Sequence, residues 1–381
     1  PPSWGAWSAA ASAGSAAAEA RPRNCGAVRG EKERTKGCTS RKKRYICGNR
    51  NPLSAMKNRL NRLLYGKNSK PLYFVRNVVR YLTPKRLTQA RLAGVLAELE
   101  RRPDREYILD RVDYYCKLTP GAAGTGGLWP LGRHRYGSEV KSAYFFDTYE
   151  YTRWFDDALL WDYLPGDITE VPGDRPCIVK SRPVAGDNAF SVVLNLDKCR
   201  HFVFLRDAIP FREKQDKAIF QLDINGKPHR RRFMEMYFGS ACCDAGIIAP
   251  RPEYPPEWEK PRIGLYDHLG YKFIMAIEGN DVATNLKWIM STNSVAVMPR
   301  PTYETWFMEG RLVPNYHYIE IRSDYSDLEE RLHYYATHPE EAEAIVAHAH
   351  EYVAQFRDRR RERLVSLLVL AKYFRCTGQR P

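Results

Sequence analysis

The sequence lacks several features that would place it in a well-marked class. Its 381 residues contain no apolar run of eighteen residues, so no transmembrane helix is expected. The Ala/Ser-rich start has no Leu/Val/Ile-rich centre and is therefore not interpreted as a signal peptide. The nine cysteines are scattered without a CxxC pair, which argues against a zinc site or a disulfide framework. Reduced thiols in a cytosol are the default expectation.

Metal-binding patterns are also missing. There is no Asp-x-Asp of the kind that holds a divalent cation on a diphosphate, and the nine histidines are dispersed. No His-based metal site is predicted, and His201, beside Phe202, is interpreted as structural.

Acidic residues are scarce at the start of the chain, where the positive charge gathers. Of the net charge of +15, residues 1–55 carry +8, which leaves the other 326 residues only mildly basic. We interpret 1–55 as a disordered basic tail that is not necessarily native, with Met56 as a candidate natural start. A nucleic-acid patch at Arg41-Lys42-Lys43-Arg44 is the alternative.

Apolar and basic residues alternate from residue 57 to residue 86. The apolar ones from Leu72 to Leu82 have helical spacing, and Lys and Arg surround them. Such a segment either lies on an anionic membrane or packs on the body of the protein with its basic face solvated. We prefer the second interpretation.

The middle of the chain predicts a mixture of helices and strands. Helices are expected over 88–100 with Thr88 as N-cap, 107–118, 149–163 and 233–238, and then over 326–335, 339–356 and 364–374. Strands are expected over 177–183, 202–204 and 218–222, and a short strand or helix over 191–196. The glycine-rich stretch 120–127 is expected to be a loop, and 250–261, with five prolines, an interdomain linker.

Residues 271–322 are the most informative stretch. Short apolar runs at 271–277, 294–298 and 317–321 predict strands, and 282–290 and 303–308 predict helices between them. This alternation is typical of a parallel sheet, whose ligands bind at the carboxyl ends of its strands. Gly279 lies at such an end, and the helix predicted after it would attract phosphate.

Several motifs in this order resemble glycosyltransferase family 90. They are IVKSRP (178–183), EGNDVATNLKW (278–288), YETWFMEG (303–310) and RERLVSLLVLAKYF (361–374). The family includes protein O-glucosyltransferases, capsule xylosyltransferases and bacterial lipopolysaccharide core-sugar transferases, and the bacterial branch is the most similar. The resemblance covers the chain from about residue 56 to its end.

The resemblance implies an α/β fold with two Rossmann-like lobes of the GT-B type. Expected parts are a helical segment 56–120, an acceptor-side lobe 121–249, the linker 250–261, and a nucleotide-sugar-binding lobe with terminal helices 262–381. It also implies inverting transfer from a nucleotide sugar, expected to be a UDP-sugar, to a hydroxyl of a lipopolysaccharide or capsule glycan. No metal is required. We expect a cytoplasmic protein, peripheral on the inner membrane face if 57–86 contacts lipid.

The resemblance assigns the general base to an Asp that precedes a Val-Pro pair, which here is Asp167 before Val171-Pro172. The alternative is that Asp167 only caps the turn after Pro165-Gly166. Glu170 is the other nearby carboxylate.

Donor-binding candidates follow from the need to neutralise a leaving diphosphate and to hold a nucleotide. They are Arg230, Gly279, Asn280, Asp281, Thr284, Asn285, Lys287 and Glu304. Lys180 and Arg182, at the end of a buried strand, are expected to line the cleft. The alternatives are that Lys287 solvates a helix face and that Glu304 is an ordinary solvent-facing residue.

The sequence departs from the family at two places, and one of them is the absence of an Arg that other members have near Asn285. Many members have Arg-Gly after the strand that ends at Phe220, and this chain has Gln221 and Leu222. The loss leaves open reduced activity, or replacement by the cluster Arg230–Arg232. The alternative function is therefore a catalytically weakened relative that binds a nucleotide sugar or glycan. A nucleic-acid partner has only the pI of 9.3 and the basic tail in its favour, and none is predicted.

Overall fold

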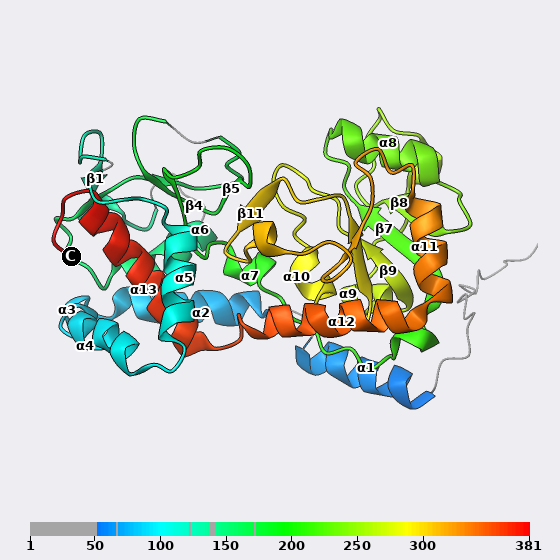
Figure 1. Ribbon diagram of the computed structural model, residues 1–381, viewed down its shortest axis with the longest axis horizontal. Coiled ribbons are helices and arrows are strands. Elements are labelled where there is room, and N and C mark those ends of the chain that lie inside the picture. The colour runs from blue at the N-terminus through cyan, green and yellow to red at the C-terminus, as the bar shows by residue number, and fades with distance from the viewer. Residues whose placement is uncertain (1–51, 66–67, 122, 138–141, 171–172) are drawn as a thin grey trace, which may run out of the picture. The chain divides into compact units, whose positions relative to one another are not determined.

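The computed structural model describes residues 52–65, 68–121, 123–137, 142–170 and 173–381 (Figure 1). They belong to one compact unit, Gly48–Pro381. The expectations for residues 1–51, including the basic patch, lie outside the described residues. The chain has the predicted mixed α/β class, with parallel sheets. No described helix combines the length and apolar character needed to span a membrane.

The larger sheet has five parallel strands. They are β7 (Gln215–Leu222), β8 (Cys243–Ile247), β9 (Tyr271–Met275), β10 (Val295–Met298) and β12 (Ile319–Glu320), in the order β12-β10-β9-β7-β8. The three strands predicted between residues 271 and 321 are therefore confirmed, as is their parallel direction. The strand predicted over 218–222 is confirmed as part of β7.

Both faces of this sheet are covered at its centre, which explains why β10 is apolar throughout and why β9 is apolar from Phe273 to Met275. Phe273 and Val297 face one core, whereas Ile274 and Ala296 face another. The first core is filled from α8 (Pro228–Tyr237), α11 (Leu328–Thr337) and α12 (Pro339–Ala354). The second core continues to a smaller sheet.

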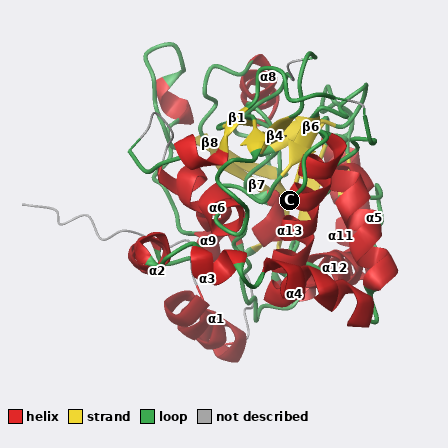
Figure 2. Ribbon diagram, turned by 90° about the vertical axis from the view of Figure 1, so that its left-hand side faces the viewer, coloured by secondary structure: helices red, strands yellow, loops and turns green. Residues whose placement is uncertain are grey.

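The smaller sheet has three parallel strands, β3 (Tyr163–Leu164), β4 (Cys177–Val179) and β6 (Ser191–Val193), in the order β3-β4-β6. Its core includes side chains of α5 (Arg105–Tyr115), α6 (Ser142–Thr152) and α13 (Arg359–Cys376). Figure 2 shows helices around the strands.

Two short antiparallel ribbons complete the strands. β1 (Trp129–Pro130) pairs with β2 (Leu160–Trp161), and β5 (Ser181–Pro183) pairs with β11 (Tyr303–Thr305). The second ribbon sets Arg182 opposite Glu304, which follows it by 122 residues in the chain. It therefore joins the end of the smaller sheet to the segment that follows β10.

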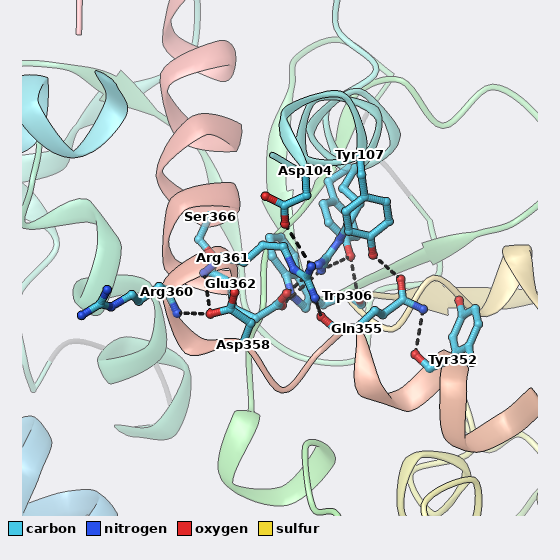
Figure 3. Close-up of polar contacts among 12 residues, drawn as sticks. Asp104, Tyr107, Trp306, Tyr352, Gln355, Asp358, Arg360, Arg361, Glu362 and Ser366 are labelled. Carbon is cyan, nitrogen blue, oxygen red and sulfur yellow. Dashed lines mark hydrogen bonds and ion pairs between the residues drawn. The ribbon is translucent and has the colours of Figure 1, made fainter. Parts of the chain in front are cut away.

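The last helix returns to the smaller sheet and packs on α4 (Leu92–Ala97), α5 and α6. Figure 3 shows the polar contacts at this junction, where the Trp306 indole N–H donates to Glu362 at 2.5 Å and Arg361 donates to Asp104 at 3.0 Å. Glu362 also pairs with the fully buried Arg111 at 2.5 Å. Three separate segments of the chain are locked together here.

Of the two helices predicted between residues 271 and 322, one is wrong and the other is shorter than expected. The segment 303–308 is strand β11 followed by the 3-10 turn η5 (Glu309–Arg311), because β5 supplies a pairing partner. The helix predicted over 282–290 shrinks to α10 (Leu286–Ile289). Before it the chain bends, and the Asn285 amide donates to the Met275 carbonyl at 2.9 Å. No helix N-terminus follows Gly279 directly.

Other predicted elements differ in extent. The helix expected over 88–100 is split into α3 (Arg86–Gln89), α4 and η1 (Glu98–Arg101), and Thr88 lies inside α3 rather than at its N-cap. The segment 149–163 is helical only to Thr152, and 202–204 forms no strand after α7 (Lys198–His201). The helices expected over 107–118, 233–238, 326–335, 339–356 and 364–374 are confirmed as α5, α8, α11, α12 and α13. Short helical pieces remain at η2 (Leu131–Arg133), η3 (Phe211–Glu213), η4 (Pro256–Trp258) and α9 (Leu265–His268).

The proline-rich segment 250–261 does not separate two sheets. β7 and β8, which precede it, pair with β9 in the same sheet, so the larger sheet starts at residue 215. Trp258 in η4 is buried, and Glu259 bridges to Ile247 at the end of β8. The segment is therefore packed onto the sheet edge.

The first two helices are α1 (Pro52–Tyr65) and α2 (Lys70–Leu82). The preferred interpretation, a helix packed on the body with its basic face solvated, is confirmed only in part for α2: Tyr73 and Tyr81 pack on the aromatic cluster of α6 and Arg76 is exposed, but the aliphatic residues are exposed as well. The buried residue of α2 is Asn77, while Leu72 and Leu82 are 68% and 75% exposed. The reason is a set of polar partners on α6, among them Asp147 and Glu150, which attract the polar side of α2.

Candidate active site

Four of the predicted site residues meet where three parallel strands end. Asp167 follows β3, Lys180 follows β4, and Asn280 and Asp281 follow β9. The Lys180 Nζ lies 2.7 Å from Asp281 Oδ2 and also forms an ion pair with Asp167. The Asn280 amide donates to Asp167 Oδ2 at 3.2 Å. We call these four residues the Asp167 cluster, and they bring the carboxyl ends of both parallel sheets together.

The cluster is buried on one side and open on the other. The Lys180 side chain is 2% exposed, whereas that of Asp167 is 29% exposed. Burial alone would raise the pKa of Asp167, but the hydrogen bond and the charge of Lys180 outweigh it and hold this pKa below its ordinary value. Asp167 is therefore ionised at neutral pH, and solvent reaches it. Its carboxylate is held by side chains of two other loops.

Burial disfavours the charged form of Lys180, but its neighbours favour it more strongly. Asp281, Tyr144 and Asp167 raise the pKa of the ammonium above its ordinary value. Lys180 therefore stays protonated between two carboxylates and fixes the distance between them. The arrangement provides one accessible carboxylate supported by a permanent cation.

Arg230, on the first turn of α8, clamps the loop after β9. Its Nε donates to the Glu278 carbonyl at 2.8 Å, and its Nη2 donates to the Ile277 carbonyl at 2.9 Å. Its Nη1 donates to the Asp223 carbonyl after β7, at 2.8 Å. A Cβ on Gly279 would lie 2.9 Å from Arg230 Nη2, so glycine permits this close approach. The shape of the loop therefore depends on both residues.

Three predicted residues are enclosed instead. Arg182 and Glu304 are 0% and 2% exposed, and Arg182 Nε donates to Glu304 Oε1 at 2.7 Å. The other carboxylate oxygen accepts the Tyr114 hydroxyl. Lys287 is fully buried and pairs with Glu309 at 2.5 Å. Lys287 thus does not solvate a helix face, and Glu304 does not face solvent. We call these two pairs the enclosed pairs.

Thr284 and Asn285 lie at the bend before α10 and are partly buried. The side-chain amide of Asn285 donates to the carbonyl of Met275 in β9, and this hydrogen bond stabilises the bend. Glu170, the other carboxylate near Asp167, is exposed, and Val171 and Pro172 lie outside the described residues.

The sequence interpretation missed a hollow behind Lys180. It is too narrow to admit a water molecule and is lined by Lys180, Leu194, Leu196, His201, Phe202, Thr305 and Trp306. Burial and the cations Lys287, Lys180 and Arg200 keep the pKa of His201 well below its ordinary value, so its ring is neutral. Its Nδ1 is buried without a hydrogen-bond partner among the described residues. No local pattern in the sequence places His201 beside Lys180.

A metal ion finds few ligands in the described part of the chain. Nowhere in it do three His, Cys, Asp or Glu side chains gather in a way that would hold a metal. The metal independence of the reaction stays a prediction.

Comparison with known proteins gives a family and two relatives. Residues 206–360 match the sequence model of glycosyl transferase family 90. O-glucosyltransferase LpsA of Dichelobacter nodosus is 36% identical over 309 residues, which cover 79% of this chain and 94% of that protein. Protein O-glucosyltransferase 2 of Danio rerio is 32% identical over 83 residues, 22% of this chain and 16% of that protein. The family match contains Arg230, Asn280 and Asp281, whereas Asp167 and Lys180 precede it.

Proposed function

Since the chain belongs to glycosyltransferase family 90 and is a glycosyltransferase, we propose that it transfers a sugar with inversion from a nucleotide donor to a glycan hydroxyl. The acceptor is a lipopolysaccharide or capsule glycan, carried as a glycolipid on the cytoplasmic side of a membrane. The observation that carries the proposal is the meeting of Asp167, Lys180 and Asp281 at the carboxyl ends of strands from both parallel sheets.

Asp167 acts as the general base. The acceptor oxygen attacks the anomeric carbon while its proton passes to the Asp167 carboxylate, and the bond from the sugar to the diphosphate breaks on the opposite face. Asp167 suits this role because it is ionised, reachable and oriented by Lys180 and Asn280. A positioned base of this kind contributes about 10²–10⁴-fold to the rate.

The leaving nucleoside diphosphate needs positive charge or N–H donors. In this proposal the loop 278–281 and Arg230 serve the donor, with Thr284 and Asn285 at its edge. Arg230 directs three donors to backbone carbonyls, so its first contribution is to shape the loop. No metal is required. Lys287, Arg182 and Glu304 support the site from inside the protein.

The two-lobe GT-B arrangement belongs to the same proposal. The donor lobe is built on the five-stranded sheet, and the acceptor lobe on the three-stranded sheet with α5, α6 and α13. The division follows the sheets, so residues from 215 onward belong to the donor side.

Glucose is the sugar we propose first. Both relatives are named O-glucosyltransferases, and the bacterial one is similar over most of the chain. UDP-glucose is therefore the donor to test before other nucleotide sugars. No nucleic acid takes part.

The second candidate function is a catalytically weakened relative that binds a nucleotide sugar or glycan. The observation in its favour is Gln221, the next-to-last residue of β7, at a place where many family members have a cation. Its Oε1 is buried without a hydrogen-bond partner among the described residues. Turnover separates the two candidates, because the weakened relative binds without transferring.

The test combines thermal melting with turnover. The full chain is melted with UDP, GDP, CMP and UDP-glucose, in EDTA and then with Mg²⁺, and UDP release from UDP-glucose is followed without and with a lipopolysaccharide acceptor. A ligand that binds only the folded state stabilises it by about 2.7 kcal/mol at a hundred times its Kd. We expect a UDP-specific rise in Tm in EDTA and measurable UDP release. A rise without release favours a weakened relative that still binds the nucleotide sugar, and no rise with any nucleotide contradicts the transferase and favours a relative that binds the glycan.

A further inference from the structure

The first two helices are attached to the protein with their polar sides inward. From α2, the Tyr73 hydroxyl donates to Asp147 at 2.8 Å and Arg80 donates to Glu150 at 2.8 Å. From α1, Ser54 donates to Glu213 at 2.9 Å and Asn58 donates to Asp207 at 3.0 Å. A surface helix ordinarily buries its apolar stripe and exposes its polar one. In α1 and α2 a stripe of aliphatic side chains is exposed instead, while Tyr73 and Tyr81 of α2 pack their rings on Phe145, Phe146 and Tyr149.

Their apolar stripes therefore face outward. The stripe of α2 consists of Leu72, Val75, Val79 and Leu82, which are 60–75% exposed, and that of α1 consists of Leu53, Met56 and Leu60, which are 56–61% exposed. The spacings of three and four residues put each set on one side of its helix. Leu87, in α3, is exposed to a similar degree.

The charge around these stripes has one sign. Residues 52–97 contain ten Lys or Arg and no Asp or Glu. Several of the cations are exposed, namely Lys57, Arg59, Lys70, Arg76 and Arg86. Figures 1 and 2 place α1, α2 and α3 in the lower half of both views. An apolar stripe flanked by cations is the surface that lies in the headgroup region of an anionic bilayer.

We propose that α1 and α2 dock the protein on an anionic lipid bilayer, with their apolar stripes at the acyl boundary and their cations on lipid phosphates. Other occupants fit the charge less well. A second copy would bring two positive surfaces together, and residues 1–51 carry a net charge of +8 and would be repelled. The docking itself is independent of the proposed function. Only its purpose rests on that function, because a docked enzyme would lie next to the sugar of a glycolipid acceptor.

The test is co-sedimentation of the full chain with vesicles. Vesicles of phosphatidylcholine with phosphatidylglycerol are compared with vesicles of phosphatidylcholine alone, at low and high salt. We expect binding to the anionic vesicles that high salt weakens. The triple variant Leu72→Ser, Val75→Ser, Leu82→Ser should bind about tenfold more weakly, because three exposed apolar side chains are removed from the boundary. The matched control is Val313→Ser, an exposed apolar residue outside these helices.

A second variant, Lys70→Gln with Arg86→Gln, should reduce the salt dependence while keeping the apolar contribution. The proposal is overturned if the full chain ignores anionic vesicles, or if the triple variant binds them as tightly as the parent. It is also overturned if the parent is a dimer that the triple variant dissociates, since a second copy would then cover this face.

Failure of the docking and failure of the proposed function give different results. Asp167→Asn should bind vesicles like the parent, and the triple variant should keep the same Tm rise with UDP. A chain that binds vesicles but neither binds nor turns over nucleotide sugars would sustain the docking alone.

Discussion

The Asp167 cluster and the enclosed pairs use the same chemistry in two environments. Lys180 and Arg182 are two residues apart, and each pairs with a carboxylate from the second half of the chain. Lys180 supports a carboxylate that is 29% exposed, whereas Arg182 and Glu304 are sealed from water. A cation in a family motif can therefore either support an accessible carboxylate of the site or stabilise the buried structure around the site, and the burial of its partner distinguishes the two roles.

The largest effect on activity should come from removing the exposed carboxylate of Asp167. Asp167→Asn should lower turnover about a thousandfold, because the amide cannot accept the acceptor proton. The Tm should change little, since the side chain is partly in solvent and Lys180 keeps Asp281. UDP release and thermal melting measure the two effects. Asp174→Asn, at an exposed carboxylate, is the matched control. Turnover within about threefold of the parent would remove Asp167 from the chemistry.

A change in the enclosed pair of Arg182 and Glu304 should lower the stability of the fold. Glu304→Gln leaves the buried Arg182 charge without its carboxylate and should lower the free energy of unfolding by about 3 kcal/mol. Urea unfolding measures this loss. The double variant Arg182→Met, Glu304→Gln should lose less than the sum of the single changes, because no unpaired charge remains. Unchanged stability together with a large loss of donor affinity would place Glu304 in contact with the donor.

A pH profile sharpens the role of Lys180. In the parent, Lys180 keeps the pKa of Asp167 below its ordinary value despite burial. Asp167 therefore stays ionised as the pH falls below neutral, and its titration should not lower kcat/KM in that range. Lys180→Gln removes the hydrogen bond and the charge and leaves the effect of burial, so the pKa of Asp167 should rise and the acid limb of the profile should move to higher pH. The stability that ionised Asp167 contributes is present above its unfolded-state pKa and is lost as pH falls through its folded-state pKa. An unmoved acid limb would show that Lys180 does not control Asp167.

The smallest effect is expected from a change in the loop after β9, at Gly279. Gly279→Ala places a Cβ against Arg230 Nη2, and the guanidinium must shift from the Ile277 and Glu278 carbonyls. We expect donor affinity to fall about tenfold, which corresponds to about 1.4 kcal/mol. Titration with UDP measures it. Gly124→Ala, where a Cβ meets nothing within 4 Å, is the control. Unchanged affinity would show that Arg230 relaxes without disturbing the donor.

Strands β9, β10 and β12 and the second half of β7 could be predicted because each contains a short apolar run bounded by turn residues, whereas β8 was not predicted, because Asp244 and Gly246 interrupt its apolar residues. β11 could not, because Tyr303–Thr305 forms a strand only where β5 offers its edge, more than a hundred residues earlier. The bend before α10 depends on a bond from Asn285 back to β9. Both errors arise from partners that are distant along the chain.

The site residues also fall into those that the sequence could identify and those whose surroundings depend on distant partners. Asp167, Lys180, Asn280 and Asp281 were chosen from separate motifs, and the structure brings them together. Lys287 and Glu304 came from the same motifs, yet each is buried against a counter-charge. A motif records which residue types are present, and the exposure of each depends on neighbours that only packing supplies.

The sequence by itself determined the α/β class, the parallel sheet after residue 271, the family resemblance and the basic, apolar character of residues 57–86. The resemblance rests on motifs that follow one another in the family's order, and the other features follow from composition and from periodicities along a single segment. Only the tertiary structure decided which cations face the Asp167 cluster, which are sealed, and which side of α2 points outward. These depend on Asp147 and Glu150 under α2 and on Glu304 opposite Arg182, contacts that form only when distant segments pack together.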